Sequence, residues 1–311
     1  MTKFTMVFPG QGSQSVGMLN ELSDKYPIIK ETFSQASAVL GYDLWQLVQA
    51  GPAEELNKTW NTQPALLAAS VAIFRVWQEE HGAMPEFMAG HSLGEYSALV
   101  CAGVINFDDA IKLVELRGKL MQEAVPAGTG AMYAIIGLDN ESIAKACEQA
   151  AQGQVVSPVN FNSPGQVVIA GNKEAVERAG ILCKEAGAKR ALPLPVSVPS
   201  HCALMKPAAD KLAEALKNIT FNQPKYPVIN NVNVKMESDS QAIKDALIAQ
   251  LYSPVRWTEC VEYMAKNGIT ILIEVGPGKV LTGLTKRIVD SLSGTAINDS
   301  ASLLTALESV K

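Results

Sequence analysis

The segment Gly90-His91-Ser92-Leu93-Gly94 has the residue types and spacing that could place a reactive serine at the end of a strand. In the pattern G-x-S-x-G, a sharp strand-to-helix turn lifts the serine hydroxyl to the top of a sheet. Glycine on both sides avoids a Cβ that would crowd the neighbouring strand and helix. Residues 87–89 indicate a short buried strand and residues 95–102 a helix, which is the context that the motif needs. Ser92 is therefore the candidate nucleophile, and a passive serine in a tight turn is the alternative.

A serine nucleophile usually needs a base, and the chain contains 3 histidines. His81 ends a predicted helix, where we expect it to be exposed. His91 adjoins the serine, and neighbouring side chains diverge in a sharp turn. By elimination, His201, in the proline-containing loop 198–201, is the candidate base. The alternative is that His201 caps the helix predicted to begin near Ala203.

Arg117 is the clearest anomaly in the hydrophobic pattern. At about 100° per residue, it lies in the middle of the apolar side of the helix predicted over 108–124, together with Leu113, Val114, Leu120 and Met121. An unpaired guanidinium there costs several kcal/mol, so Arg117 needs an anionic partner. That partner is either a buried carboxylate of the chain or a substrate carboxylate held by two parallel hydrogen bonds.

The overall composition excludes several classes of protein. A net charge of −5 argues against general nucleic-acid binding, and an apolar fraction of 48% in 311 residues supports a sizeable core. No apolar run is long enough for a membrane span or a signal peptide. The 5 cysteines are an odd number without C-x-x-C spacing, which suits reduced thiols rather than a disulfide frame or a zinc site. We therefore expect a cytoplasmic protein that binds no metal.

The order of predicted elements indicates an α/β fold with an inserted small domain. Alternating helices and short buried strands predict a hydrolase-like core with a mainly parallel sheet. After the linker 126–130 the pattern changes to strand, helix, strand, strand, helix, strand, with the last strand over 190–196. This is the βαββαβ order of a ferredoxin-like module. We predict a core of residues 1–127 and 198–311, a small domain of residues 128–197, and a substrate cleft between them.

Some segments give weaker signals. The loop Pro9-Gly10-Gln11-Gly12 matches neither a dinucleotide-binding nor a P-loop pattern; it is either an ordinary turn or a loop that brings backbone N–H groups close to a substrate. Thr62-Gln63-Pro64 should lead into a long apolar helix over 65–80. A basic helix is expected over 283–292, and the final dozen or so residues are uninformative.

Several motifs together carry a family resemblance. They are Phe8-Pro9-Gly10-Gln11-Gly12-Ser13-Gln14, Thr62-Gln63-Pro64-Ala65, Gly90-His91-Ser92-Leu93-Gly94-Glu95, Arg117, Asn160-Phe161-Asn162-Ser163-Pro164, Pro199-Ser200-His201 and Gly276-Pro277-Gly278. In this order and at these distances, the chain resembles the malonyl-CoA:acyl carrier protein transacylases of bacterial fatty acid synthesis, from about residue 3 to residue 290. Acyltransferase domains of polyketide and fatty acid megasynthases are related, but a free-standing chain of this length favours the discrete enzyme.

The resemblance implies a two-step transfer through a serine ester. Ser92 would attack the malonyl thioester with His201 as general base, and the phosphopantetheine thiol of acyl carrier protein would then take the malonyl group. Implied roles for other residues are an oxyanion hole from the N–H groups of Gln11 and Leu93, a carboxylate site at Arg117, an acyl pocket lined by Gln63, substrate binding by Asn162, and a backbone carbonyl near Gln250 that orients His201. Asn162 and Gln250 could instead be ordinary turn or helix-end residues.

The same resemblance bears on partners. Acyl carrier protein and a coenzyme A thioester are the expected partners. We expect a monomer that uses no cofactor and binds neither nucleic acid nor a membrane. Because the carrier is usually acidic, docking would need a local basic patch, for which Lys189, Arg190, Lys286 and Arg287 are candidates, although such residues are more often simply solvated.

Two other classes of protein stay open at this point. A serine esterase or thioesterase of α/β-hydrolase type shares the serine turn, but it expects Ser, Asp, His in chain order and has no need of a buried arginine. A non-catalytic module that binds carrier protein would keep the fold, but it would not need to bury Arg117.

Overall fold

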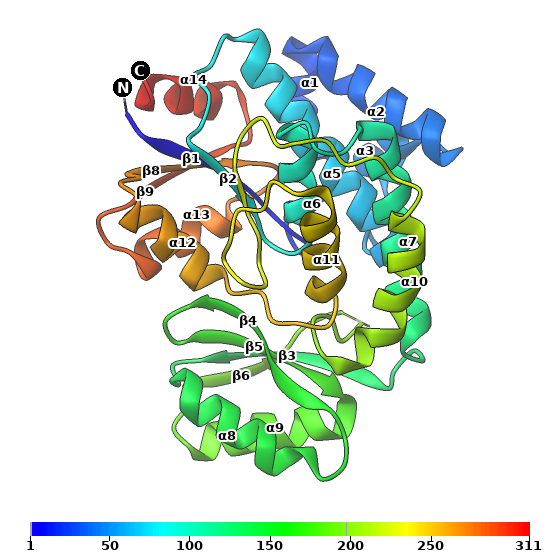
Figure 1. Cartoon of the computed structure of the whole chain (residues 1–311), viewed down its shortest axis with the longest axis vertical. Coiled ribbons are helices and arrows are strands. Elements are labelled where there is room, and N and C mark those ends of the chain that lie inside the picture. Colours follow the sequence, from blue (N-terminus) through cyan, green and yellow to red (C-terminus); the bar gives the residue numbers. More distant parts are fainter. Residues whose placement is uncertain (1, 197) are drawn as a thin grey trace.

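A computed structural model describes residues 2–196 and 198–311 and shows a larger and a smaller unit (Figure 1). The larger unit contains a parallel sheet with the strand order β7-β2-β1-β8-β9, and the smaller one an antiparallel sheet with the order β4-β5-β3-β6. The parallel strands are β1 (Phe4–Phe8), β2 (Phe87–Gly90), β7 (Val228–Ile229), β8 (Ile271–Val275) and β9 (Ser293–Ile297). The predicted α/β class with a mainly parallel sheet is therefore confirmed.

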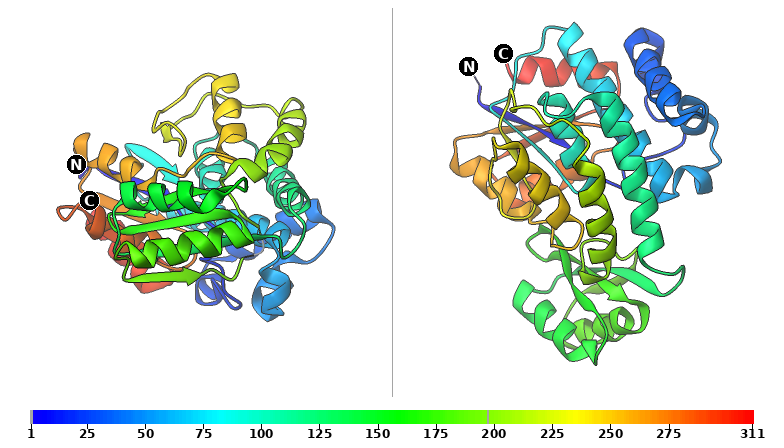
Figure 2. Two further views of the ribbon diagram at one scale, coloured as in Figure 1. Left: turned by 90° about the horizontal axis from the view of Figure 1, so that it is seen from below. Right: turned by 45° about the vertical axis from the view of Figure 1, so that its right-hand side comes forward.

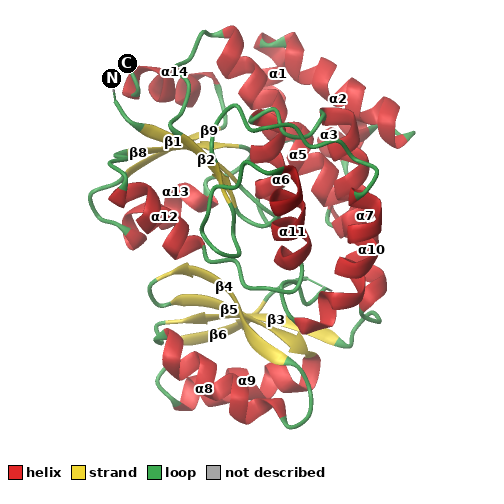
Figure 3. Ribbon diagram, in the orientation of Figure 1, coloured by secondary structure: helices red, strands yellow, loops and turns green. Residues whose placement is uncertain are grey.

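Helices cover both faces of the parallel sheet (Figure 3), and its central strand β1 is buried along its whole length. Met6 and Phe8 of β1 belong to a cluster that includes helices on one face, whereas Val7 joins the cluster on the other face. The first face carries α2 (Pro27–Leu40), α5 (Thr59–Glu79), α6 (Leu93–Cys101) and α7 (Phe107–Ala124), and the second carries α12 (Trp257–Lys266) and α13 (Val280–Ile288). All strand pairs of this sheet are parallel, so their carboxyl ends meet at one edge.

Further helices complete the larger unit. They are α1 (Asn20–Lys25), α3 (Leu44–Ala50), α4 (Ala53–Leu56), the 3₁₀ turn η1 (Ala203–Met205), α10 (Lys206–Leu216), α11 (Ser240–Gln250) and α14 (Ser300–Ser309). Over the described ranges, no helix is both long and apolar enough to cross a bilayer.

The smaller unit has the predicted βαββαβ order, and Figure 2 shows its two helices on one face of its sheet. Its elements are β3 (Gly130–Ile136), α8 (Asn140–Ala151), β4 (Val156–Ser163), β5 (Gln166–Asn172), α9 (Lys173–Glu185) and β6 (Arg190–Pro193). One face of the sheet packs on α8 and α9, and the other contributes Met132 and Val159 to a small cluster with Cys202 of the larger unit. This second contact places the antiparallel sheet beside the loop that carries His201. The exact domain boundaries at 128 and 197 stay a prediction.

The strand predicted over 190–196 is shorter than expected, because β6 ends at Pro193. Pro193 is the last residue paired with β3, where it lies opposite Tyr133. Pro195 follows two residues later, and a proline has no N–H with which to continue a sheet ladder.

Helix α5 begins at Thr59, so Thr62-Gln63-Pro64 lies inside the helix rather than before it. The prediction gave too much weight to Pro64 as the start of the helix. The first turn of α5 packs closely on α7, where a Cβ on Gly118 would lie 2.6 Å from the Cα atom of Trp60. This tertiary packing supports the extra turn against the local preference of proline.

The prediction for the helix over 283–292 was displaced toward the C-terminus, since α13 spans Val280–Ile288. The buried carboxylate of Glu274 on β8 accepts hydrogen bonds from the backbone N–H groups of Leu281 and Thr282 at 3.1 and 2.7 Å. A cap supplied from a separate strand satisfies the first turn and has no local sequence signal. The structure also contains β7, β9 and α14, which the sequence analysis did not predict.

Candidate active site

Ser92 occupies a strained turn between β2 and α6, as the motif predicts. Its backbone angles are φ 53° and ψ −111°, which a residue other than glycine adopts only when the surrounding structure holds it there. A Cβ on Gly90 would lie 1.9 Å from the carbonyl carbon of Gly94, and one on Gly94 would lie 2.0 Å from the carbonyl oxygen of Phe8. Both flanking positions therefore require glycine.

The structure brings Ser92 and His201 together, although they are 109 positions apart in the chain. The hydroxyl oxygen Oγ of Ser92 lies 2.7 Å from Nε2 of His201, and the other ring nitrogen, Nδ1, lies 2.7 Å from the backbone carbonyl oxygen of Gln250. A carbonyl can only accept, so Nδ1 carries the hydrogen and Nε2 is free to accept the serine proton. A backbone carbonyl thus stands where an aspartate stands in a Ser-His-Asp triad.

His201 is neutral in this environment. Burial, together with the nearby charge of Arg117, lowers the pKa of His201 to about 3, against the hydrogen bond to Gln250 that raises it. His91, the neighbouring histidine, is also shifted downward in pKa by burial, and its Nε2 lies 2.8 Å from Oδ1 of Asn162. His91 is therefore engaged elsewhere, in agreement with the choice of His201 as the base.

Arg117 is 1% exposed and contacts amides and a hydroxyl rather than a carboxylate. Its guanidinium donates to Oε1 of Gln63 at 2.8 Å through Nη1, and to Oε1 of Gln250 at 3.0 Å and Oγ of Ser92 at 3.3 Å through Nη2. The guanidinium also lies 5.3 Å from the ring centre of Tyr96. Its Nε has no hydrogen-bond partner, and no ion pair of Arg117 occurs within residues 2–196 and 198–311.

These contacts do not include a carboxylate of the chain, the first of the two partners predicted for Arg117. A buried guanidinium with neutral partners keeps its charge available for an anion. An anion bound at Nη2 would lie close to the atom that serine attacks, because Nη2 lies 3.3 Å from the serine oxygen.

A cavity of about 460 Å³ opens onto these groups. The larger unit contributes the serine, the histidine, the arginine and Gln11, and the smaller unit contributes Met132 and Asn160. The cavity therefore lies between the two units, where the sequence analysis expected a cleft.

The other predicted site residues surround this cavity at different depths. Leu93 lines it and begins α6, so its N–H belongs to the first turn of the helix, where the N–H groups have no partner within the helix. Gln11 also lines the cavity, and its side chain accepts a hydrogen bond from Thr59 at 2.9 Å. Gln63 is fully buried and holds Arg117. Asn162 contacts His91, whereas Asn160, two positions earlier, faces the cavity.

Two buried residues near the serine were not assigned a role from the sequence. Glu95, in the first turn of α6, accepts hydrogen bonds from the backbone N–H of Asn231 and the side-chain amide of Gln250. Burial raises the pKa of Glu95 to about 7, against the hydrogen bonds from Gln250 and Asn231, which lower it. Glu95 has one signal in the sequence, because it is the single charged residue in the otherwise uncharged run over 93–101. Asn231 has none, because it follows a strand of two residues that is too short to show a pattern.

Comparisons with known proteins agree with this geometry. A family model described as an acyl transferase domain matches residues 5–306. The malonyl CoA-acyl carrier protein transacylase of Escherichia coli K12 is 73% identical over 308 residues, covering 99% of this chain and 100% of the relative. The protein of the same name from Bacillus subtilis is 46% identical over 312 residues, covering 100% of this chain and 98% of the relative.

Solved structures give the same result. An acyl carrier protein S-malonyltransferase from Vibrio cholerae has a TM-score of 0.96 at 73% identity, covering 98% of this chain and 99% of the other. A malonyl-transacylase in complex with a type II polyketide synthase acyl carrier protein has a TM-score of 0.98 at 72% identity, covering 99% of this chain and 100% of the other.

Proposed function

The chain belongs to the acyl transferase domain family, and from this premise we propose that it transfers the malonyl group of malonyl-CoA to acyl carrier protein through a malonyl-serine ester. The observation that carries the proposal is the position of Arg117. Its Nη2 lies 3.3 Å from the serine oxygen and has no carboxylate partner in the described part of the chain. In a malonyl group the free carboxylate is one methylene away from the reacting carbonyl, so one group can reach both residues.

In the first half-reaction, Nε2 of His201 takes the proton of Ser92 as Oγ attacks the thioester carbonyl. The negative charge that develops on the carbonyl oxygen is stabilised by the N–H groups of Gln11 and Leu93, as the resemblance implies. The C–S bond then breaks, the proton on His201 passes to the departing coenzyme A sulfur, and the malonyl group stays on Ser92 as an ester.

In the second half-reaction, the phosphopantetheine thiol of acyl carrier protein occupies the place that coenzyme A has left. His201 takes the thiol proton as the sulfur attacks the ester carbonyl, and it returns that proton to Oγ of Ser92 when the ester bond breaks. The side chains of Ser92 and His201 and the backbone N–H groups suffice for proton transfer and for attack on the acyl carbonyl, because a thioester is already an activated acyl group. We therefore propose that no metal ion or cofactor takes part.

Partners and setting follow from the same proposal. The nucleophile, the base and the carboxylate site come from one chain, which supports a monomer as the working unit. The guanidinium of Arg287 on α13 donates to Gln166 of β5 at 2.8 Å, so this candidate for docking the carrier lies where the two units meet. All five cysteines are free and buried, which supports a cytoplasmic setting.

Intact mass spectrometry after mixing with malonyl-CoA, without carrier protein, tests the proposal. We expect a malonyl adduct that a phosphopantetheine thiol removes, and that Ser92→Ala abolishes. Ser97→Ala is the matched control, because this buried serine lies one turn further along α6 and should leave the adduct intact. An adduct that water removes within seconds would indicate a thioesterase, and no adduct with the wild-type chain would indicate a binding module.

The pH dependence of ester formation is a further prediction. Because the pKa of His201 is lowered to about 3, its neutral form should persist as the pH falls, and the rate constant at subsaturating malonyl-CoA should stay nearly flat from pH 8 to pH 5. A histidine with an ordinary pKa near 6.5 would lose about 30-fold over that range. Rapid-quench mass spectrometry in buffers of constant ionic strength measures the profile. An inflection near pH 6.5 would contradict the buried, neutral base.

A further inference from the structure

Two buried side-chain amides lie against the serine turn, and one carboxylate connects them. Asn231 and Gln250 are both fully buried, and Glu95 is 2% exposed. The carboxylate oxygen Oε2 of Glu95 accepts from Nε2 of Gln250 at 2.9 Å and from the backbone N–H of Asn231 at 3.0 Å. The mechanism above assigns no role to this carboxylate.

Asn231 holds the backbone of the turn on both sides of the serine. Its Oδ1 accepts from the backbone N–H of Ser92 at 2.8 Å, and its Nδ2 donates to the carbonyl oxygen of Gly90 at 2.7 Å. A turn with a positive φ at a non-glycine residue stays populated only when neighbouring contacts fix it. Asn231 supplies two of these contacts.

Gln250 connects the remaining groups of the site. Its Oε1 accepts from Arg117 at 3.0 Å, its Nε2 donates to the carbonyl oxygen of Ser92 at 3.1 Å, and its backbone carbonyl accepts from His201 at 2.7 Å. Arginine can only donate, so the oxygen end of the amide must face it. The nitrogen end carries two N–H donors; the carbonyl oxygen of Ser92 accepts from one of them, and Oε2 of Glu95 accepts from the other.

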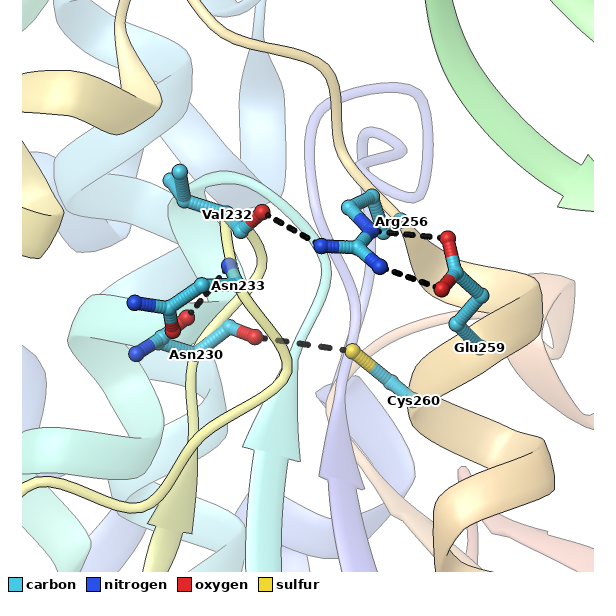
Figure 4. Close-up of polar contacts among 6 residues, drawn as sticks. All are labelled: Asn230, Val232, Asn233, Arg256, Glu259 and Cys260. Carbon is cyan, nitrogen blue, oxygen red and sulfur yellow. Dashed lines mark hydrogen bonds and ion pairs between the residues drawn. The ribbon is translucent and has the colours of Figure 1, made fainter.

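The loop that carries Asn231 is held from its other side by the start of α12, as Figure 4 shows. The backbone N–H of Arg256 donates to the carbonyl oxygen of Asn231 at 3.1 Å. The guanidinium of Arg256 donates to the carbonyl oxygen of Val232 at 3.2 Å (Figure 4). The thiol of Cys260 lies 3.6 Å from the carbonyl oxygen of Asn230. With the loop anchored there, the contact with Glu95 sets the position of Asn231 relative to the serine turn.

We propose that Glu95 is a positioning residue of this site: as an acceptor shared by Asn231 and Gln250, it fixes the two amides that align Ser92, His201 and Arg117. Glu95 itself touches none of the reacting atoms. The proposal rests on the proposed acyl transfer, and it assigns to that transfer a residue outside the nucleophile, the base and the carboxylate site.

The role requires an acceptor and does not require a charge. Burial raises the pKa of Glu95 to about 7, so both protonation states occur near neutral pH. A carboxyl group protonated on Oε1 still accepts through Oε2, as the ionised group does. The carbonyl oxygen of a glutamine can take the same position, which makes Glu95→Gln the conservative variant and Glu95→Ala the disruptive one.

The test measures separately the fraction of protein molecules that can be acylated and the rate constant with which they are acylated. Acid quench at successive times after mixing with saturating malonyl-CoA gives the final acylated fraction and the rate constant for ester formation. For Glu95→Ala we expect a rate constant lower by about 10- to 100-fold, since small misalignments of reacting groups have effects of that size. For Glu95→Gln we expect recovery to within about 3-fold of wild type, because both hydrogen bonds have an acceptor again.

Glu274→Ala is the matched control. Glu274 is an equally buried carboxylate on β8, a strand that β1 separates from β2, and it accepts backbone N–H groups at the start of α13. It should lower the melting temperature and the folded fraction without changing the rate constant. The inference is overturned if Glu95→Ala lowers only the acylated fraction, or if Glu95→Gln is as slow as Glu95→Ala. Absence of an adduct with the wild-type chain would instead overturn the proposed function.

Discussion

Replacing His201 by alanine is expected to slow formation of the malonyl-serine ester by about 10⁴-fold, with little change in the apparent affinity for malonyl-CoA. The serine oxygen has two neighbours in the site, Nε2 of His201 at 2.7 Å and Nη2 of Arg117 at 3.3 Å. A guanidinium only donates, so the serine proton has no acceptor once the imidazole is removed. Arg117 still holds the malonyl carboxylate, and binding should therefore persist. Single-turnover rates at several malonyl-CoA concentrations separate the two effects.

His91→Ala is the appropriate comparison, because His91 is also buried and lies next to the nucleophile in the chain. Its ring contacts Asn162, and the loss of one such hydrogen bond should cost no more than about 10-fold. Equal losses in the two variants would mean that the geometry has assigned the wrong histidine. Added imidazole should restore part of the rate in His201→Ala, since it can enter the space that the side chain leaves.

The main groups of the site could be predicted from the sequence because each had a local signal. The glycines around Ser92 indicated a strained turn, and the structure shows a severe clash for a Cβ at either position. Arg117 stood out because it interrupts the apolar side of an amphipathic helix. His201 was found by elimination among few histidines, and only family resemblance indicated the carbonyl of Gln250 as its partner.

The supporting residues had no comparable signal. Asn231 occurs in a polar loop after a strand of two residues, where asparagine usually indicates a turn. Glu95 accepts hydrogen bonds from residues 136 and 155 positions away, and such contacts exist only after folding. Of the two anionic partners that the sequence predicted for Arg117, a carboxylate of the chain is not found among the described residues, where its partners are neutral side chains and an aromatic ring.

The helix boundaries of the fold could likewise be predicted where they have a local sequence signal. Strong helical periodicity located α7, predicted over 108–124, to within about two residues, in the range usual for boundaries. The start of α5 depends on packing of Gly118 against Trp60, and the start of α13 on Glu274 of β8. Elements whose ends are set by distant residues were therefore displaced, whereas elements set by their own periodicity were not.

Arg117→Ala is expected to reduce malonyl transfer by about 100- to 4000-fold and to narrow or remove the preference for malonyl-CoA over acetyl-CoA. Removing one partner of a buried ion pair costs about 3–5 kcal/mol, and each factor of ten in rate corresponds to about 1.4 kcal/mol. An acetyl group has no carboxylate, so it leaves the charge of Arg117 unpaired in the wild-type site and gains nothing from it. The ratio of kcat/KM for the two donors measures the effect.

The ratio is the decisive quantity because Arg117 also supports the site. Its hydrogen bonds to Gln63 and Gln250 are lost in the variant, and that loss should slow both donors together. Arg75→Ala is a matched control: this half-buried arginine on α5 contacts Thr32, Gln35 and the ring of Phe107, and its removal should lower stability without changing the ratio. If Arg117→Ala slows malonyl and acetyl transfer equally, the role of the arginine is only to hold the side-chain amides of Gln63 and Gln250. If the ratio falls while the acetyl rate changes little, the guanidinium selects the carboxylate, and the acyl specificity depends on a buried charge that has no ion pair among the described residues.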